Sequence, residues 1–246
     1  GGVAKELSLP SCFPIMRELE VEHGGLVKGM IARKREKKRR ERAEGTQRKA
    51  GSPAGPGGRL TSFKGGLDAL TTRLGERVLP ILRTSHTVSH VTRDENGWTV
   101  FGKAGEIAQT RRLIVTCPTF VATKLFKEYD HDLSVAFGAV SYAPIVVVAT
   151  GHRREDIDHS LNGFGFLIPR HQRIRTLGSI WTSSIFANRA PEGHVQIRTM
   201  FGGAGDKSAL ELNDEELWQT IRRELGPLIG IKTDPVFTRI YRWERG

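Results

Sequence analysis

The chain has little cysteine and no long apolar run. Its 246 residues include two cysteines, Cys12 and Cys117, which lie far apart and form neither a disulfide framework nor a metal-binding pattern. This low cysteine content favours a reducing compartment. No apolar stretch reaches the ~18–20 residues that a transmembrane helix requires. Residues 1–11 resemble neither a secretory signal nor a transit peptide.

Three chemical signatures are also missing. The pattern G-x-G-x-x-G, which places a dinucleotide pyrophosphate at a helix N-terminus, does not occur in the sequence. Residues 202–205 contain three glycines, but their spacing differs from that of the pattern. The eight histidines show no metal-ligand spacing. No pair of carboxylates indicates an acid–base dyad. We therefore predict no metal site and no catalytic side chain in these residues.

Positive charge is abundant but concentrated in one place. Residues 33–42 (RKREKKRRER) hold eight basic and two acidic residues, a net +6 of the total +11. Aromatic side chains are not interleaved with this run, so nucleic-acid binding is not expected. The solvated end of a helix is the favoured interpretation. Contact with an anionic membrane surface is the alternative.

Apolar periodicity and turn residues predict an α+β fold in three parts. Residues 1–60 form a helical segment with the basic run and a flexible linker, residues 61–120 begin with a helix and continue as strands, and residues 121–246 form a mixed β-sheet with flanking helices. The expected helices are at 7–42 with a break at 24–25, from 61 onward, at 119–126, and from Asn213 to near Pro227. The expected strands are at 88–91, 98–100, 112–116, 145–150, 163–169, 177–182, 195–201 and 236–243.

Glycines stand beside large apolar residues within residues 161–206. Two runs, at 163–169 and 195–202, are rich in both kinds of residue. Glycine lets a ligand approach the backbone closely, and the neighbouring aromatic and aliphatic side chains supply contact area. This composition suits a large, planar, hydrophobic ligand.

Short motifs along almost the whole chain resemble those of oxygen-dependent protoporphyrinogen oxidases. The most specific is G-F-G-F-L-I-P at residues 163–169. The other motifs are the N-terminal spacing of Leu7, Ser8, Phe13, Pro14, Glu20, Gly25 and Gly29, then S-F-K-G-G-L at 62–67, T-C-P at 116–118, S-Y-A-P at 141–144 and M-F-G-G at 200–203. The N-terminal motif departs from the family pattern at two positions, since Val3 stands where Asp is usual and Gly25 where Ser is usual.

The resemblance implies an FAD enzyme that oxidises protoporphyrinogen IX to protoporphyrin IX in haem biosynthesis, with oxygen as acceptor. It makes residues 61–120 part of an FAD-binding domain of the α/β FAD-linked superfamily, and residues 121–246 a substrate-binding domain. It also implies that Val88 meets the adenine side of FAD through its backbone. The residues implied to line the tetrapyrrole cleft are Phe164, Gly165, Leu167, Ile180 and Met200.

Several alternatives stay open. The chain resembles, less closely, other flavin amine oxidase-like enzymes that act on coproporphyrinogen, carotenoids or amines, and a non-catalytic basic adaptor would use residues 33–42. A cytoplasmic protein of bacterial type, peripheral on the inner membrane, and a homodimer are the further expectations. Because the dinucleotide motif and the C-terminal flavin segment are absent, we expect an internal fragment that is inactive alone.

Overall fold

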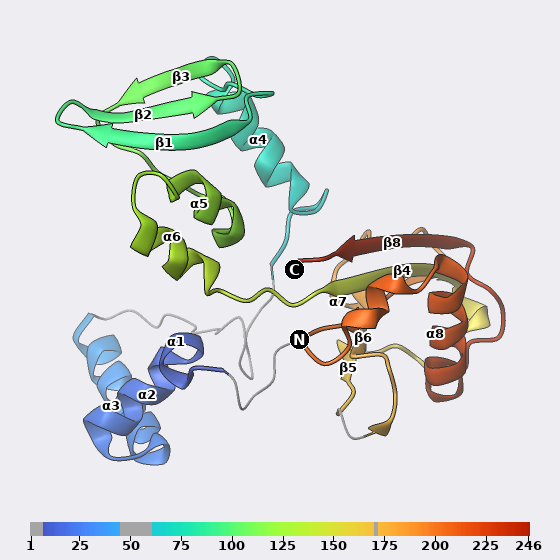
Figure 1. The fold of residues 1–246 in the computed structure, drawn as a ribbon. Coiled ribbons are helices and arrows are strands. Elements are labelled where there is room, and N and C mark those ends of the chain that lie inside the picture. Colours follow the sequence, from blue (N-terminus) through green and yellow to red (C-terminus); the bar gives the residue numbers. More distant parts are fainter. Residues whose placement is uncertain (1–6, 45–60, 170–171) are drawn as a thin grey trace. The chain divides into compact units, whose positions relative to one another are not determined.

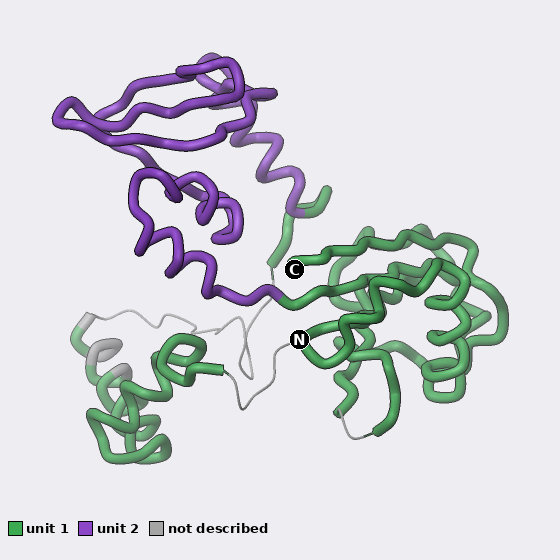
Figure 2. The backbone as a smooth tube through the Cα atoms, viewed as in Figure 1, with its two compact units in different colours: residues 1–66, 143–246 green, residues 67–142 purple. Residues whose placement is uncertain are grey.

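The computed structural model describes residues 7–44, 61–169 and 172–246. The chain forms two compact units, which Figure 2 distinguishes by colour. One unit comprises Gly1–Gly66 and Ala143–Gly246, and the other comprises Leu67–Tyr142. Each is described by itself. Among the described residues, no helix has both the length and the apolar character needed to cross a bilayer.

The N-terminal segment is helical, as the sequence predicts. It consists of α1 (Leu9–Cys12), α2 (Pro14–His23) and α3 (Leu26–Glu44), with the expected break at Gly24, whose φ is +69° (Figure 1). Gly29 lies against the buried Leu19, and a Cβ at Gly29 would come within 2.7 Å of the Leu19 side chain. The small residue therefore lets α2 and α3 pack closely. The basic run belongs to α3, whereas the predicted linker at 45–60 lies outside the described residues.

The unit Leu67–Tyr142 combines a three-stranded antiparallel sheet with helices. Its strands pair in the order β1-β2-β3. The predicted turn joins β1 and β2, where the Asp94 carboxylate accepts hydrogen bonds from the backbone N–H groups of Asn96 and Gly97. The core is formed by Val91, Ala122, Leu125 and Phe126. The elements are α4 (Asp68–Val78), β1 (Val88–Asp94), β2 (Gly97–Gly102), β3 (Gly105–Thr110), α5 (Thr119–Phe126) and α6 (His131–Gly138).

Two features of this unit differ from the sequence-based expectation. The strand predicted at 112–116 is wrong, because Gly105, with φ of +113°, returns the chain at once and β3 is formed by Gly105–Thr110. Helix α6 was not predicted, although the Asp130 carboxylate caps its first turn by accepting from the N–H of Leu133. Helix α5 packs against β1, and the compact unit extends to Tyr142, while the predicted division into cofactor-binding and substrate-binding parts at residue 120 stays a prediction.

The other unit is built on a five-stranded sheet, in which every pairing is antiparallel. The strand order is β5-β6-β7-β4-β8. Together with the first sheet and the helices, this architecture confirms the predicted α+β class. The elements are β4 (Ile145–Arg153), η2 (Arg154–Asp156), β5 (Gly165–Leu167), β6 (Gly178–Ile180), α7 (Thr182–Ile185), β7 (His194–Gly202), η4 (Lys207–Glu211), α8 (Asp214–Ile229) and β8 (Phe237–Trp243).

Helix α8 covers one face of this sheet. Asn213 and Glu216 form a capping box at its start, as the predicted cap at Asn213 requires. The helix ends at Ile229, close to the predicted end near Pro227, and Gly230, whose φ is +66°, caps it. The core beneath it joins Val146, Val148 and Phe201 of the sheet to Leu217, Trp218, Ile221 and Leu225 of the helix. Helix α8 therefore covers one face of the five-stranded sheet and not the other.

Candidate functional site

Strand β7 divides its side chains between two environments. Val195, Ile197, Thr199 and Phe201 are buried, and the first, second and fourth belong to hydrophobic clusters that include residues of α8. Successive side chains of a strand point to opposite faces. The residues between them, such as Arg198 and Met200, therefore point to the face opposite α8. We call this second surface the open face of the sheet.

Strand pairing brings four of the predicted cleft residues to the open face. Gly165 lies opposite Ile180 in the pairing of β5 with β6, and Leu167 lies opposite Gly178. Gly178 in turn lies opposite Met200 in β7. Directly paired residues project to the same side of a sheet. Gly165, Leu167, Ile180 and Met200 consequently share one surface, and 78% of Leu167 is exposed.

Phe164 stands immediately before β5 and is also exposed, with 61% of its surface accessible. Its carbonyl oxygen accepts a hydrogen bond of 2.9 Å from the backbone N–H of Trp181. Trp181 is buried against Phe166, with the two ring centroids 6.2 Å apart. The position of Phe164 is thus set by the packed side of the sheet, although its own side chain is free to meet a ligand.

Gly165 and Gly178 are required by the close approach of β5 and β6. A Cβ at Gly165 would overlap the carbonyl oxygen of Ser179, and the φ of Gly165 is +120°, which L side chains rarely adopt. A Cβ at Gly178 would come within 2.5 Å of the Phe166 carbonyl oxygen. The glycines therefore serve the pairing of these strands and also leave a low surface on the open face.

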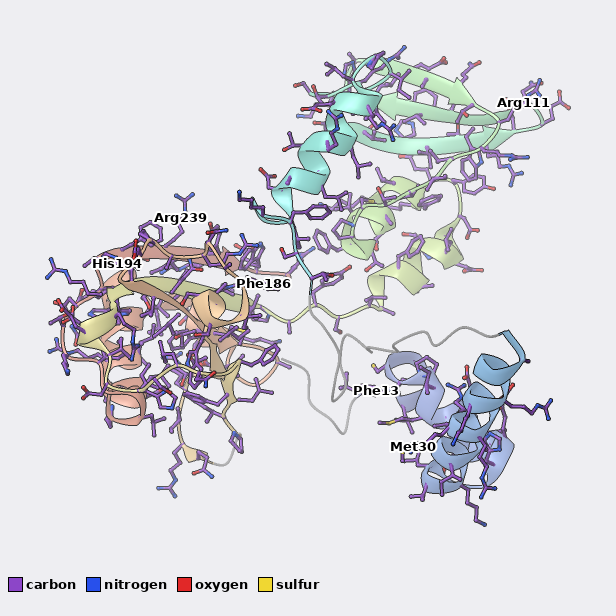
Figure 3. The ribbon with its side chains drawn as sticks, turned by 180° about the vertical axis from the view of Figure 1, so that it is seen from behind. Phe13, Met30, Arg111, Phe186, His194 and Arg239 are labelled. Atoms are coloured by element: carbon purple, nitrogen blue, oxygen red, sulfur yellow. The ribbon has the colours of Figure 1, made fainter. Side chains whose placement is uncertain are left out.

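The open face includes aromatic and basic residues that the sequence analysis missed. Tyr241 and Trp243 of β8 stack with ring centroids 5.5 Å apart and an interplanar angle of 15°. Figure 3 shows Arg239 extending outward from the same strand. In residues 237–243, every second position is aromatic or arginine, and this spacing is the sequence signal that could have identified the surface. The aromatic and basic residues of the open face are Arg198 of β7 and, in β8, Phe237, Arg239, Tyr241 and Trp243.

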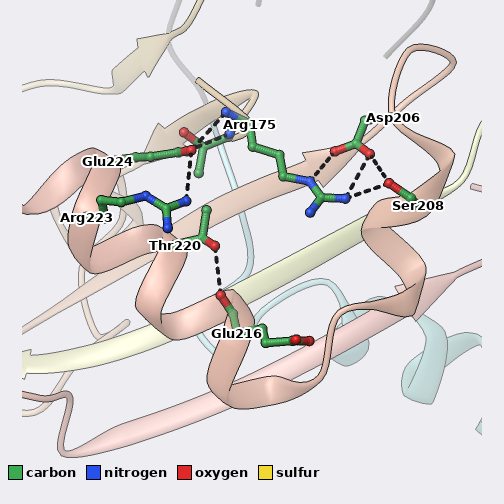
Figure 4. Close-up of polar contacts among 8 residues, drawn as sticks. Arg175, Asp206, Ser208, Glu216, Thr220, Arg223 and Glu224 are labelled. Atoms are coloured by element: carbon green, nitrogen blue, oxygen red, sulfur yellow. Dashed lines mark hydrogen bonds and ion pairs between the residues drawn. The ribbon is translucent and has the colours of Figure 1, made fainter. Parts of the chain in front are cut away.

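An ion pair fixes the connection that leads into β6. The Nε of Arg175 donates to Oδ2 of Asp206 over 2.7 Å, and another guanidinium nitrogen donates to Oδ1 over 3.0 Å (Figure 4). The same arginine donates to the Ser208 hydroxyl, and Glu224 of α8 accepts from the backbone N–H groups of Arg175 and Thr176. These bonds tie the start of β6 to η4 and to α8.

The electrostatics of this pair follow from its hydrogen bonds. The bond from Arg175 lowers the pKa of the Asp206 carboxyl below its usual value, despite partial burial, which opposes the shift. The bond to Asp206 raises the pKa of the Arg175 guanidinium. Both groups are therefore charged near neutral pH. Together with the bonds to Ser208 and Glu224, the pair holds the backbone that leads into β6.

Val88, the predicted cofactor contact, belongs to the unit Leu67–Tyr142. It is half-buried at the start of β1, paired with Gly102 and packed beside the core around Val91. β1 is an edge strand of its sheet, so one side of its backbone is not paired within that sheet. A hollow of about 420 Å³ adjoins it, lined by Ser85, His86, Thr87 and residues 102–107. These features fit a backbone contact with an adenine ring. The sequence offers no pyrophosphate-binding loop.

The described residues provide no cluster of three His, Cys, Asp or Glu side chains suitable for a metal ion. Cys12 is exposed and Cys117 is half-buried, and both are free thiols. The open face offers exposed apolar and basic side chains, such as Leu167 and Arg239, to a ligand.

Comparison with known proteins gives consistent results. Residues 1–245 match the family described as flavin containing amine oxidoreductase. The chain is 29% identical to the chloroplastic protoporphyrinogen oxidase of Oryza sativa subsp. japonica, over 98% of the chain and 47% of that protein. It is 28% identical to the coproporphyrinogen III oxidase of Staphylococcus aureus (strain NCTC 8325 / PS 47), over 96% of the chain and 49% of that protein.

A solved structure shares the fold. A crystal structure of a protein from Exiguobacterium sp. 255-15 matches 96% of this chain and 47% of its own chain, with a TM-score of 0.68 at 20% identity. At that identity the likeness concerns the fold alone. The chain spans about half the length of the curated relatives it matches.

Proposed function

Because the chain belongs to the flavin-containing amine oxidoreductase family, we propose that it is the substrate-binding part of an FAD-dependent porphyrinogen oxidase. The substrate is protoporphyrinogen IX, and oxygen is the electron acceptor. The observation that carries the proposal is the shared surface of Gly165, Leu167, Ile180 and Met200. These are residues that the resemblance to protoporphyrinogen oxidases implies for the tetrapyrrole cleft, and their common surface supports that assignment.

The chemistry of the open face supports a tetrapyrrole ligand. Leu167 offers a large exposed apolar surface on the open face, Phe164 adds exposed aromatic area just before β5, and Gly165 and Gly178 keep the backbone low. A tetrapyrrole macrocycle buries apolar area against such a surface, and this burial favours binding. The similar proteins from Oryza sativa and Staphylococcus aureus are named as oxidases of protoporphyrinogen and of coproporphyrinogen III, and both compounds are tetrapyrroles.

The chain's own residues bind, orient and shield the substrate. FAD, when bound, would accept the hydride equivalents that leave the macrocycle. Val88 would contribute a backbone contact to the adenine side of that cofactor. Phe164, Leu167, Ile180 and Met200 would hold the ring system and exclude water from one of its sides. No proton transfer is assigned to a side chain of this chain.

A second substrate is favoured by a specific observation. The coproporphyrinogen III oxidase of Staphylococcus aureus is nearly as similar to the chain as the rice protein. The two candidate substrates differ in the number of carboxylates at the rim of the macrocycle. Amine oxidation is less well supported, since an open apolar and basic surface suits an anionic tetrapyrrole better than a small cation.

The proposal is tested with the complete protein that contains this chain. Porphyrin fluorescence reports the oxidation of protoporphyrinogen IX and of coproporphyrinogen III, measured in parallel. Phe164→Ala and Met200→Ala are each expected to raise KM about tenfold, as lost apolar contact of ~1–2 kcal/mol implies, with flavin content unchanged. Leu228→Ala is the matched control, because Leu228 is exposed on α8.

The outcomes separate the alternatives. Turnover of either porphyrinogen, with the cleft variants impaired and the control normal, supports the proposal and identifies the substrate. Unchanged kinetics in both cleft variants would remove the open face from the substrate site. Oxidation of amines without oxidation of either porphyrinogen would overturn the substrate class.

A further inference from the structure

Two arginines flank a single alanine on the open face. Ala149 of β4 is paired with Arg198 of β7 on one side and with Arg239 of β8 on the other. Neighbouring strands are about 4.8 Å apart, so the two arginine backbones lie roughly 10 Å apart on the same surface. Only the methyl group of Ala149 stands between them in this row. The register therefore brings together two cations that are distant in sequence.

Neither cation has an acidic partner in the part of the chain that the structure describes. Arg198 and Arg239 are both exposed, and no carboxylate lies within ion-pair distance of either among residues 7–44, 61–169 and 172–246. The Arg239 guanidinium instead lies 5.7 Å from the centroid of the Tyr241 ring. On the α8 side the situation differs, since Arg242 of the same strand binds Asp214 at 2.7 Å.

Apolar surface adjoins the arginines on one side. The next row across the sheet contains Leu167, Gly178, Met200, Val147 and Tyr241, as the strand register requires. Trp243 stacks on Tyr241 beyond this row. The open face therefore has an apolar region, exposed at Leu167 and Tyr241 and buried at Val147, that is bordered by two guanidinium groups. Its complement is a flat, apolar molecule that carries two carboxylates along one edge.

We propose that Arg198 and Arg239 bind the carboxylates at the edge of the anionic tetrapyrrole and fix its orientation on the open face. This inference rests on the proposed function and adds the residues that recognise charge. A guanidinium binds a carboxylate through two parallel N–H···O hydrogen bonds, which sets both position and direction. Two such groups on either side of Ala149 define one edge of the ligand, while Met200 and Leu167 contact its apolar body.

The test measures binding rather than turnover. The complete protein is titrated with protoporphyrin IX and, separately, with its dimethyl ester, and quenching of tryptophan fluorescence gives both dissociation constants. Arg198→Gln and Arg239→Gln are each expected to weaken binding of the diacid about 10- to 100-fold, as loss of a charged hydrogen-bonding pair implies. Binding of the ester is expected to change by less than about threefold, because the ester has no charge to lose.

Two further variants make the test specific. Arg223→Gln is the control, because Arg223 is exposed on α8, on the other side of the sheet. Arg198→Lys keeps the charge but loses the paired geometry, and it is expected to give an intermediate affinity for the diacid. It also serves as the informative variant if the glutamine substitution prevents folding.

Each result bears on the inference. Selective loss of diacid binding in the arginine variants supports it. Equal loss of diacid and ester would mean that the arginines act through packing, and normal diacid binding in both variants would mean that other parts of the protein hold the carboxylates. Either result overturns the assignment while leaving the proposed function intact. Failure of the unmodified protein to bind either porphyrin would overturn both.

Discussion

Arg175 and Asp206 face each other edge to edge, with two guanidinium nitrogens 2.7 and 3.0 Å from the two carboxylate oxygens. This pair joins the entrance of β6 to the segment that follows β7. The common surface of the open face depends on the register between β6 and β7. The ion pair therefore stabilises the backbone on which this surface is built.

Removing the charge of Asp206 should loosen this support. We expect Asp206→Asn to lower the free energy of unfolding by about 1–3 kcal/mol at pH 7, since hydrogen bonds to charged groups are among the stronger ones. Urea denaturation followed by tryptophan fluorescence measures the change. Asp158→Asn is a suitable control, because Asp158 forms a more exposed ion pair with Lys232.

The contribution of Asp206 should also depend on pH in a defined direction. Its pKa is lowered in the folded protein, so its stabilisation is complete above the unfolded value of about 3.9 and disappears as pH falls through the folded pKa. The difference in stability between the natural protein and Asp206→Asn should therefore be constant from pH 7 to 5. It should shrink as the pH is lowered below about 4, and a constant difference at pH 3 would contradict this account.

His152 should make the protein sensitive to mild acid. Its ring is buried under α8 near Trp218, neither ring nitrogen has a hydrogen-bond partner, and burial lowers its pKa despite the opposing charge of Asp156. The unfolded chain therefore binds a proton near pH 6.5 that the folded chain resists, and stability falls as pH drops below that value. His152→Leu should flatten the dependence of the urea midpoint on pH between about 6.5 and 5. A dependence in His152→Leu that equals that of the natural protein would contradict this account.

Gly165 should tolerate no side chain. Gly165→Ala combines an unfavourable φ, which costs about 1–2 kcal/mol, with a clash against the Ser179 carbonyl, which adds about 1–3 kcal/mol. Gly105→Ala is the matched control, since its φ of +113° is similar but nothing lies within 4 Å of the added Cβ. A thermal melt should show a clearly larger loss for Gly165→Ala. Equal losses would mean that backbone conformation alone, and not the contact between β5 and β6, requires glycine.

The cap of α8 should contribute measurably to stability. Asn213→Ala removes the side-chain acceptor for the N–H of Glu216 and is expected to cost about 1 kcal/mol. Asn213→Asp keeps an acceptor at the positive end of the helix and should restore most of the loss. Helical circular dichroism at increasing urea concentration distinguishes the two variants. Identical midpoints for both would show that the capping bond is unimportant.

Much of the local structure could be predicted from the sequence because its signals are local. The break at Gly24, the turn after Asp94 and the cap at Asn213 each depend on residues that are close in the chain. Helix α6 was missed because its apolar residues alternate with polar ones over too short a length to show a clear period. The strand expected at 112–116 was misplaced because the apolar content there is higher than in β3.

The candidate site could be predicted only in part. Motif resemblance assigned Phe164, Gly165, Leu167, Ile180 and Met200, but their common surface follows from strand register, which depends on pairing between distant segments. For the same reason the sequence could not reveal that Arg198 and Arg239 share Ala149 as a neighbour. Their roles in binding, like membrane contact and the homodimer, stay predictions.

The alternation along β7 separates two kinds of evolutionary constraint within one strand. Ile197, Thr199 and Phe201 face the packed side, so substitution there disturbs folding for every substrate. Arg198 and Met200 lie between them and can change without repacking α8. Substitutions at positions 198 and 200 can therefore change the selectivity for a ligand while the packing of the sheet against α8 is retained. Laboratory selection for a new ligand should accordingly accumulate substitutions at 198 and 200 before it touches their buried neighbours.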